Sequence, residues 1–225
     1  MSVVVFDIET IGVDFTSLDE ISKSKLLKSA DNEEEEQEIK NSLGLSPLTG
    51  EIVTVAMLDV ETDQGAVFYQ DKNPANAQKA FKEKNVEYVV CTEKEILKYF
   101  WQNIRKYQQF VTFNGRGFDC PYLIIRSGIM KIKPTRELMP YRYDTKLHID
   151  LYDQMTFYGA MRRGFSLHML TQAFGIRSPK EEGIDGAQVQ ELFAQGRCED
   201  IARYCLRDVE ATKQLYLNWE KFIKN

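Results

Sequence analysis

The pattern of apolar and polar residues predicts β-strands in the first third of the chain. Residues 3–7 are a short apolar run that ends in an acidic residue, and such runs are typical of buried strands. A long polar stretch follows, from about residue 11 to residue 50. Residues 51–59 and 66–70 then have the pattern of two strands, joined through the turn residues 63–65.

Helical patterns alternate with a strand in the middle of the chain. Thr92 and Glu95 have the spacing of a capping box, which begins a helix with a repeating apolar face. Residues 109–114 form the next predicted strand, and residues 121–127 a helix that ends near Gly128.

Two helices complete the chain. Ser166 is a good cap for a helix that extends to residue 174. The last and longest helix covers residues 198–222, with one apolar stripe along it. Strands early, alternation in the middle and helices at the end predict an α/β fold with a mixed sheet.

Composition fits one large domain without a membrane partner. The chain has 225 residues, 43% of them hydrophobic and 28% charged, and no internal repeat or linker divides residues 1–225. No apolar run reaches membrane-spanning length, and the first residues turn acidic too early for a signal peptide. We therefore expect a cytoplasmic protein. The four cysteines lack metal-binding spacing, which favours reduced and mostly buried thiols.

The negative net charge comes from one acidic insertion at about residues 14–45. The net charge is −5. Six acids without an intervening base contribute −6 of it, so the rest of the chain carries +1. Such a run is typical of a solvated loop or helix end. An alternative is an acidic flap that repels duplex nucleic acid or shields a site. The six acids are Asp31, Glu33, Glu34, Glu35, Glu36 and Glu38.

Three short acidic strings stand far apart in the sequence. Asp7 and Glu9 lie two residues apart on the first strand, so their side chains leave the same face while Ile8 points to the other. Asp119 follows a glycine-containing turn after residues 109–114, where it could also be a structural helix cap.

The third string lies on the last helix. Tyr204 and Asp208 are four residues apart, and therefore share one helical face that borders the apolar stripe. Each string alone has an ordinary structural explanation, but together they indicate one shared site. Four carboxylates without a histidine favour Mg²⁺ or Mn²⁺, and a pair of such ions is the equipment for phosphodiester cleavage.

The strings also resemble a known family. In order and type they are similar to the three motifs of DEDD-type 3′-5′ exonucleases, and Tyr204 four residues before Asp208 is typical of the DEDDy subgroup. The greatest similarity is to the proofreading domain of family-B DNA polymerases and its stand-alone bacterial relatives. Residues 46–53 and 148–151 also resemble that family, so the likeness covers nearly the whole chain. The acidic insertion departs from it.

The resemblance implies a ribonuclease H-like fold, with a central mixed sheet of five to six strands flanked by helices. It also implies roles for the acidic residues. Asp7 would contact both ions, Glu9 and Asp208 would hold the ion that carries the attacking water, and Asp119 would serve the second ion. Tyr204 would orient the water. The resemblance further implies substrate contacts by the residues Thr10, Asn114 and Phe118 within the motifs.

A basic segment at residues 131–146 offers further substrate contacts. Arg142 and Tyr143 lie in it, and cations interleaved with aromatic rings are typical of single-strand binding. A solvated basic loop is an equally good interpretation. Arg162, Arg163 and Phe165 are a second, weaker candidate, whereas both histidines (His148 and His168) are interpreted as packing or hydrogen-bonding residues.

The sequence therefore predicts a metal-dependent 3′-5′ exonuclease that acts on single-stranded DNA in preference to RNA and releases nucleoside 5′-monophosphates. The 3′-to-5′ direction of digestion is implied by the resemblance alone. Three alternatives stay open: an RNA exonuclease, a catalytically silent nucleic-acid-binding module, and a proofreading subunit for a separate polymerase or repair partner. The first alternative stays open because carboxylates and a tyrosine do not report on the sugar 2′-hydroxyl.

Overall fold

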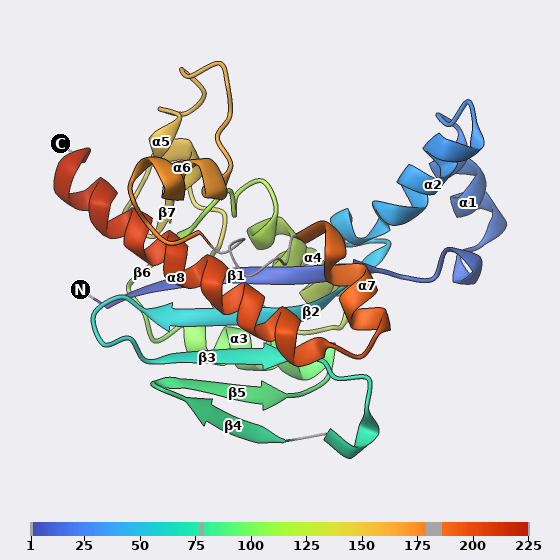
Figure 1. Ribbon diagram of the computed structural model, residues 1–225, viewed down its shortest axis with the longest axis horizontal. Helices are drawn as coiled ribbons and strands as arrows, with labels where there is room; N and C mark the ends of the chain where they lie inside the picture. Colours follow the sequence, from blue (N-terminus) through green and yellow to red (C-terminus); the bar gives the residue numbers. More distant parts are fainter. Residues whose placement is uncertain (1, 77–78, 179–185, 225) are drawn as a thin grey trace.

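A mixed β-sheet organises the molecule. The computed structural model describes residues 2–76, 79–178 and 186–224, and within them the sheet has seven strands in the order β4-β5-β3-β2-β1-β6-β7 (Figure 1). The strands are β1 (Val3–Gly12), β2 (Gly50–Asp59), β3 (Gly65–Tyr69), β4 (Ala80–Glu83), β5 (Val86–Val90), β6 (Gln109–Thr112) and β7 (His148–Asp150).

Helices flank the sheet on both faces. The α-helices are α1 (Glu20–Leu27), α2 (Glu33–Asn41), α3 (Glu93–Ile104), α4 (Asp119–Ile129), α5 (Leu151–Met155), α6 (Leu167–Ala173), α7 (Val189–Ala194) and α8 (Cys198–Phe222). Short 3-10 helices are η1 (Phe15–Ser17), η2 (Leu43–Leu45), η3 (Pro74–Asn76) and η5 (Gly186–Gln188). No helix in the described residues is long and apolar enough to cross a membrane.

The centre of the sheet is the strand β1. It pairs antiparallel with β2 along its whole length, but parallel with β6 only at Val3, Val4 and Val5. The rest of β1 therefore has one edge that no strand covers. The register with β2 shifts between Glu9 and Thr10, because β2 carries one extra residue there.

Two apolar cores lie on opposite faces of the sheet. Val3 and Val5 of β1 pack in the core that contains the apolar stripe of α8, which crosses the sheet in Figure 1. Val4, Phe6 and Ile8 pack in the core with α3 and α4. The alternation follows from the two-residue period of a strand.

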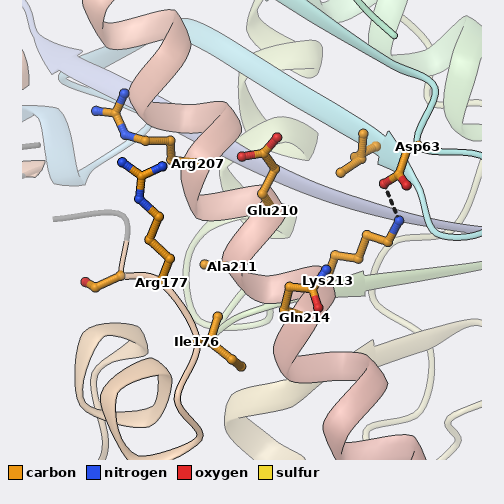
Figure 2. A pocket seen from close by; sticks show the side chains of 10 residues that line it. Asp63, Ile176, Arg177, Arg207, Glu210, Ala211, Lys213 and Gln214 are labelled. Atoms are coloured by element: carbon orange, nitrogen blue, oxygen red, sulfur yellow. Dashed lines mark hydrogen bonds and ion pairs between the residues drawn. The ribbon is translucent and has the colours of Figure 1, made fainter. Parts of the chain in front are cut away.

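The C-terminal half of the long helix α8 also makes a polar contact. Lys213 is buried on α8, and its ammonium group forms an ion pair with Asp63 in the turn between β2 and β3 (Figure 2). Lys213 is buried whereas Asp63 is exposed, so the pair satisfies the buried ammonium group and links α8 to this turn.

The acidic insertion forms an arm that projects from the sheet. Helices α1 and α2 contain no buried residue and lie to one side of the molecule in Figure 1. Glu33, Glu34, Glu35 and Glu36 form the first turn of α2, where the helix dipole favours negative charge, and Asn32 caps it. The interpretation of this run as a solvated helix end is confirmed.

Most predicted elements are present. The strand predicted at residues 3–7 extends to Gly12, and the helix predicted at residues 121–127 runs from Asp119 to Ile129. The capping box at Thr92 and the cap at Ser166 are both formed. The sheet has seven strands rather than the five to six that the resemblance implied. The apolar pattern did not predict β4, β5 and β7, which are only four, five and three residues long.

Candidate active site

The first two carboxylates lie on the face of β1 that α8 covers. Asp7 and Glu9 follow Val3 and Val5 at the two-residue period, and Ile8 is buried in the opposite core. Asp7 is half-buried and Glu9 is buried. Both carboxylates therefore lie on one face of β1, as the sequence predicted, and the structure shows that α8 covers this face.

Asp119 approaches from the uncovered edge of β1. It is the first residue of α4, and its Oδ1 accepts a hydrogen bond of 3.1 Å from the backbone N–H of Ile8. That N–H has no strand partner because β6 pairs only with the beginning of β1. The contact places a buried carboxylate beside Asp7 and satisfies a backbone donor that would otherwise be unpaired.

A tight turn carries Asp119 to this position. Asn114 has a φ of 61°, a left-handed conformation that asparagine tolerates better than most residues. At Gly115, a Cβ atom would lie 2.4 Å from the Thr112 hydroxyl, so the turn requires glycine there.

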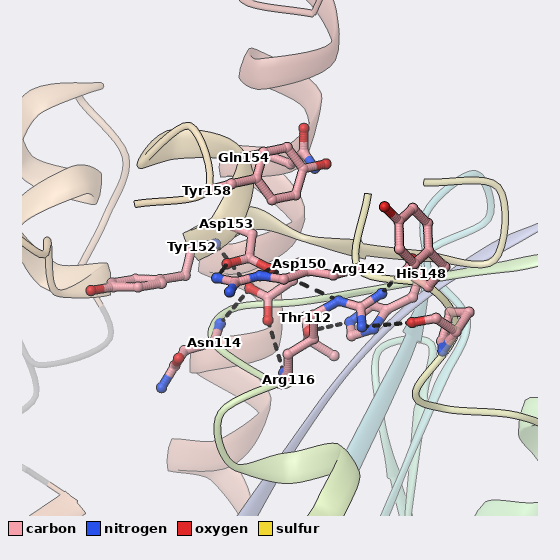
Figure 3. Close-up of polar contacts among 12 residues, drawn as sticks. Thr112, Asn114, Arg116, Arg142, His148, Asp150, Tyr152, Asp153, Gln154 and Tyr158 are labelled. Carbon is pink, nitrogen blue, oxygen red and sulfur yellow. Dashed lines mark hydrogen bonds and ion pairs between the residues drawn. The ribbon is translucent and has the colours of Figure 1, made fainter. Parts of the chain in front are cut away.

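Asp150 holds this turn by hydrogen bonds (Figure 3). Its Oδ1 accepts hydrogen bonds from the N–H of Asn114 at 2.9 Å and of Tyr152 at 3.0 Å. Its Oδ2 accepts the N–H of Arg116 at 2.8 Å. One buried carboxylate at the end of β7 thus links the turn before Asp119 to the start of α5.

The remaining site residues come from α8. Tyr204 and Asp208 both line the cleft that Asp7 and Asp119 also line. Cys205 follows Tyr204 on α8, and its buried thiol lies 3.7 Å from Oδ2 of Asp7 and 3.5 Å from the backbone oxygen of Asp7, so its single S–H can donate to either. The ligand atoms of Asp7, Glu9 and Cys205 all lie within 4.8 Å of one another.

Three segments distant in sequence therefore meet in one cleft of about 470 Å³. The lining is Asp7, Phe113, Asn114, Phe118, Asp119, Tyr152, Phe165, Ser166, Leu167, His168, Tyr204 and Asp208. A second groove of about 850 Å³ contains Glu9, Thr10 and Leu45 and shares Phe118 with the cleft. A third pocket, shown in Figure 2, has none of the four carboxylates in its lining.

The carboxylates raise one another's pKa values. Burial raises the pKa of Asp7 well above its usual value, and the charges of Asp119, Asp208 and Glu9 raise it further. Burial raises the pKa of Asp119 to about 7, although its hydrogen bond from Ile8 acts in the opposite direction. When these carboxylates are all ionised they repel one another, unless positive charge is bound among them.

The donor chemistry fits a hard divalent cation. Burial and the carboxylates of Asp7, Glu9 and Asp208 raise the pKa of the Cys205 thiol well above its usual range, so the sulfur stays protonated and donates rather than binds metal. The ligands that remain are carboxylate oxygens, which Mg²⁺ and Mn²⁺ prefer.

Tyr204 stays neutral at physiological pH. Burial raises the pKa of its hydroxyl, as do the charge of Asp208 and a hydrogen bond with it. Its hydroxyl is therefore a hydrogen-bonding group beside Asp208, not a base.

The predicted substrate residues are divided between the cleft and the surface. Asn114 and Phe118 line the cleft, and Thr10 lines the adjacent groove. Arg142 instead forms a two-fold ion pair with the buried Asp153, and Tyr143 is exposed outside the lining of both.

Several residues of the site were not singled out as such from sequence. Cys205 was assigned only to the apolar stripe of α8, and Asp150 only to a family-like segment. Phe113 and Tyr152 pack edge to face in the cleft, with ring centroids 5.9 Å apart. The two histidines form the side-chain hydrogen bonds expected of them, His148 with Thr112 and His168 with Ser178. For Asp150, a signal was present, because an acid directly after a strand is a good helix cap.

Comparison with known proteins decides the family. Residues 66–225 match the family described as "Predicted 3′-5′ exonuclease related to the exonuclease domain of PolB". The chain belongs to this family. Asp119, Tyr204 and Asp208 lie in the matched part of this PolB-related exonuclease, and Asp7 and Glu9 precede it.

Curated relatives are named DNA polymerases. The chain is 28% identical over 208 residues to a DNA polymerase of Desulfurococcus sp. (strain Tok), which covers 76% of this chain and 26% of that protein. It is 36% identical over 150 residues to a DNA polymerase of Methanocaldococcus jannaschii, covering 61% of this chain and 9% of that protein. The chain thus spans about a quarter or less of the length of these relatives.

A solved structure shares the fold. The family B DNA polymerase from Pyrobaculum calidifontis aligns with a TM-score of 0.63 and 17% sequence identity, over 98% of this chain and 25% of that chain. This agreement covers the sheet and its flanking helices and supports the ribonuclease H-like fold expected from the sequence.

Proposed function

We propose that this PolB-related exonuclease removes nucleotides from the 3′ end of single-stranded DNA by metal-dependent hydrolysis, releasing nucleoside 5′-monophosphates. The observation that carries the proposal is the meeting of Asp7, Asp119, Tyr204 and Asp208 in one cleft, with Glu9 beside Asp7. Residues 1–225 would act as one domain, with the segment 14–45 as an insertion in it.

The four carboxylates would hold two Mg²⁺ or Mn²⁺ ions. Asp7 would be central to this set, because the charges of Glu9, Asp119 and Asp208 all act on its carboxylate. Bound there, the ions supply an activated water and stabilise the charge that develops on the phosphate. Two doubly charged ions balance four carboxylates, which removes the repulsion that raises the pKa of Asp7.

The other residues of the cleft would orient the reactants. The neutral hydroxyl of Tyr204 would hold the attacking water by a hydrogen bond. The thiol of Cys205 would fix the rotamer of Asp7. Phe113, Phe118 and Phe165 offer apolar faces to the terminal sugar and base, which suits a substrate whose sequence is not read.

The direct test is digestion of end-labelled oligonucleotides. We expect a 5′-labelled single strand to shorten stepwise with Mg²⁺ or Mn²⁺ and to stay intact with a chelator. Asp7→Ala and Asp208→Asn should abolish cleavage while binding of the strand survives. Cleavage that continues in either variant or in chelator would contradict the proposal, and shortening from the 5′ end would contradict its polarity.

DNA is proposed ahead of RNA because the similar proteins are named DNA polymerases. DNA and RNA strands of one sequence, digested in competition, test this preference. Faster loss of the RNA strand would assign the protein to RNA processing, and binding without cleavage of either strand would favour a silent binding module. Proofreading for a separate polymerase or repair partner is compatible with the same chemistry.

A further inference from the structure

Exposed aromatic side chains gather beside the cleft but outside its lining. Tyr141 is 74% exposed, Tyr143 58% and Phe157 60%. The tyrosine rings are in contact, with centroids 5.5 Å apart for Tyr141 and Tyr143 and 4.7 Å apart for Tyr143 and Tyr158, and Phe157 directly precedes Tyr158 in the chain. Large apolar side chains that cluster at the surface often mark a binding site. We call this cluster the aromatic surface; its residues are Tyr141, Tyr143, Phe157 and Tyr158.

The backbone is strained where it presents two of these rings. Phe157 and Tyr158 are consecutive residues with φ of 51° and 55°, a conformation that non-glycine residues rarely adopt. Hydrogen bonds hold it in place, from the N–H of Tyr158 to the oxygen of Asp153 at 2.7 Å and from Gln154 to the Tyr158 hydroxyl at 2.7 Å. Strain that the surroundings maintain is often associated with function.

The aromatic surface is continuous with the cleft on two sides. The chain runs from Tyr152, which lines the cleft, through residues 157–164 to Phe165, which also lines it. Gly164 packs directly on the Tyr152 hydroxyl. On the other side, Arg116 in the turn before Asp119 donates to the backbone oxygen of Pro140 at 2.9 Å. Figure 3 shows Tyr158 on one side of the Arg142–Asp153 ion pair and the Asn114 turn on the other.

The charged groups around these rings favour an anionic partner. Arg162 and Arg163 are exposed in the same segment as Phe157, and Lys146 is exposed close in sequence to Tyr143. Of the nearby acids, Asp150 and Asp153 are buried, and Asp153 is paired with Arg142. Asp144 is half-buried and accepts a hydrogen bond from the backbone N–H of Lys146 at 2.9 Å. Exposed cations beside aromatic rings provide both contacts that a single strand needs, with phosphate and with base.

We propose that the aromatic surface binds the single strand on the 5′ side of the nucleotide held in the cleft. Bases stack on Tyr141 and Phe157, and Arg162 and Arg163 contact the phosphates. This inference rests on the proposed function, because the cleft must hold the 3′ end for the strand to leave in this direction. The consequence is a preference for strands long enough to reach from the cleft to the surface.

Kinetics on two substrate lengths test the stacking contacts. For Tyr141→Ala and Phe157→Ala, we expect KM for a strand of about 20 nucleotides to rise at least about fivefold. Hydrolysis of a dinucleotide, which is too short to leave the cleft, should be unchanged. Tyr141→Phe should have the same KM for the long strand as the unchanged protein, because it keeps the ring. The control is Ile21→Ala, which removes an exposed apolar side chain from the distant arm.

Salt dependence tests the phosphate contacts. The double variant Arg162→Gln/Arg163→Gln should bind the long strand more weakly and with a shallower salt dependence, by roughly 0.7 in the logarithmic slope for each phosphate that the variant no longer neutralises. The matched control is Lys82→Gln/Lys84→Gln, which removes two exposed cations at β4, on the opposite edge of the sheet.

The outcomes separate this inference from the proposed function. If the unchanged protein cleaves both substrates and the surface variants have the KM and salt slope of the unchanged protein, the aromatic surface does not bind the strand and the inference is wrong. If the unchanged protein cleaves neither the dinucleotide nor the long strand, the proposed function itself fails. An equal loss on both substrate lengths would also overturn the inference, because it would indicate damage to the cleft.

Discussion

At the scale of single residues, the site depends on carboxylates whose charges are unfavourable together. Asp7 and Asp119 both have raised pKa values, and the chief cause in each is burial. Tyr204 is affected by the same charges and stays protonated. The role proposed for each group follows from this environment: the carboxylates would hold cations, and the tyrosine would hold a water.

Replacement of the Tyr204 hydroxyl should affect the reaction but not the metal site. We expect Tyr204→Phe to lower kcat by about 10- to 100-fold, because the attacking water loses its orienting hydrogen bond. The Mn²⁺-dependent rise in melting temperature should be the same as in the unchanged protein. An unchanged kcat would show that Tyr204 has only a packing role.

The raised pKa of Asp119 predicts a pH-dependent stability in the presence of a chelator. Between the unfolded value of 3.8 and the folded value of about 7, the folded state retains a proton that the unfolded state has released. Stability therefore falls as pH rises through this window and is constant above it, by up to about 1.4 kcal/mol per pKa unit.

Asp119→Asn removes this proton exchange. Melting temperatures in chelator should favour the unchanged protein over the variant more at pH 5 than at pH 8. Asp31→Asn, which changes an exposed carboxylate in the arm, is the control for the substitution itself. A difference between protein and variant that does not depend on pH would argue that Asp119 is ionised in the folded state.

The sequence predicted the carboxylates and the tyrosine that the structure brings together at the cleft, but not the residues that support them. Two-residue and four-residue spacings placed Asp7 with Glu9 and Tyr204 with Asp208, because these periods are fixed by strand and helix geometry. Cys205 could not be recognised, since its contact with Asp7 joins residues 198 positions apart. The ion pair of Arg142 with Asp153 could likewise not be recognised, so Arg142 was interpreted as a substrate contact or a solvated cation.

At the scale of elements, the site exists because β1 is longer than its neighbour β6. β6 ends before β1 does, and α4 begins beside the part of β1 that β6 does not cover. The sequence predicted a strand at residues 3–7 but not its extension to Gly12, because the alternating acids hid the apolar pattern. The turn between β6 and α4 then determines where Asp119 lies.

Asp150 should be the positioning residue of that turn. In Asp150→Asn, one acceptor oxygen becomes an amide that faces the N–H of Arg116. We expect a loss of about 1–3 kcal/mol in stability and a lower kcat, since the turn before Asp119 shifts. The matched control is Asp59→Asn, because Asp59 accepts two backbone N–H groups in the turn after β2, away from the cleft. A kcat equal to that of the Asp59 variant would show that Asp150 contributes to stability only.

At the scale of the whole molecule, the site lies on one face of the sheet, and two peripheral features lie near it. The aromatic surface lies on one side of the cleft, and the acidic arm begins where β1 ends. The groove beside Glu9 includes Glu38 at the base of this arm. The resemblance predicted the fold class, but it could not predict the arm, which departs from the family pattern.

The arm should be dispensable for folding. Replacement of residues 16–41 by a short Gly-Ser linker removes two helices that bury no side chain, so we expect a nearly unchanged melting temperature. If the arm excludes duplexes, the variant should also degrade duplex ends faster relative to single strands. A large loss of stability would contradict the description of the arm as a solvated projection.

The most direct test of the central claim is the anomalous diffraction of manganese in a crystal of the protein. We predict two peaks about 3.5–4 Å apart in the cleft, coordinated by oxygens of Asp7, Glu9, Asp119 and Asp208. No peak among these carboxylates, or manganese bound only elsewhere, would contradict the assignment of this cleft as a two-metal nuclease site.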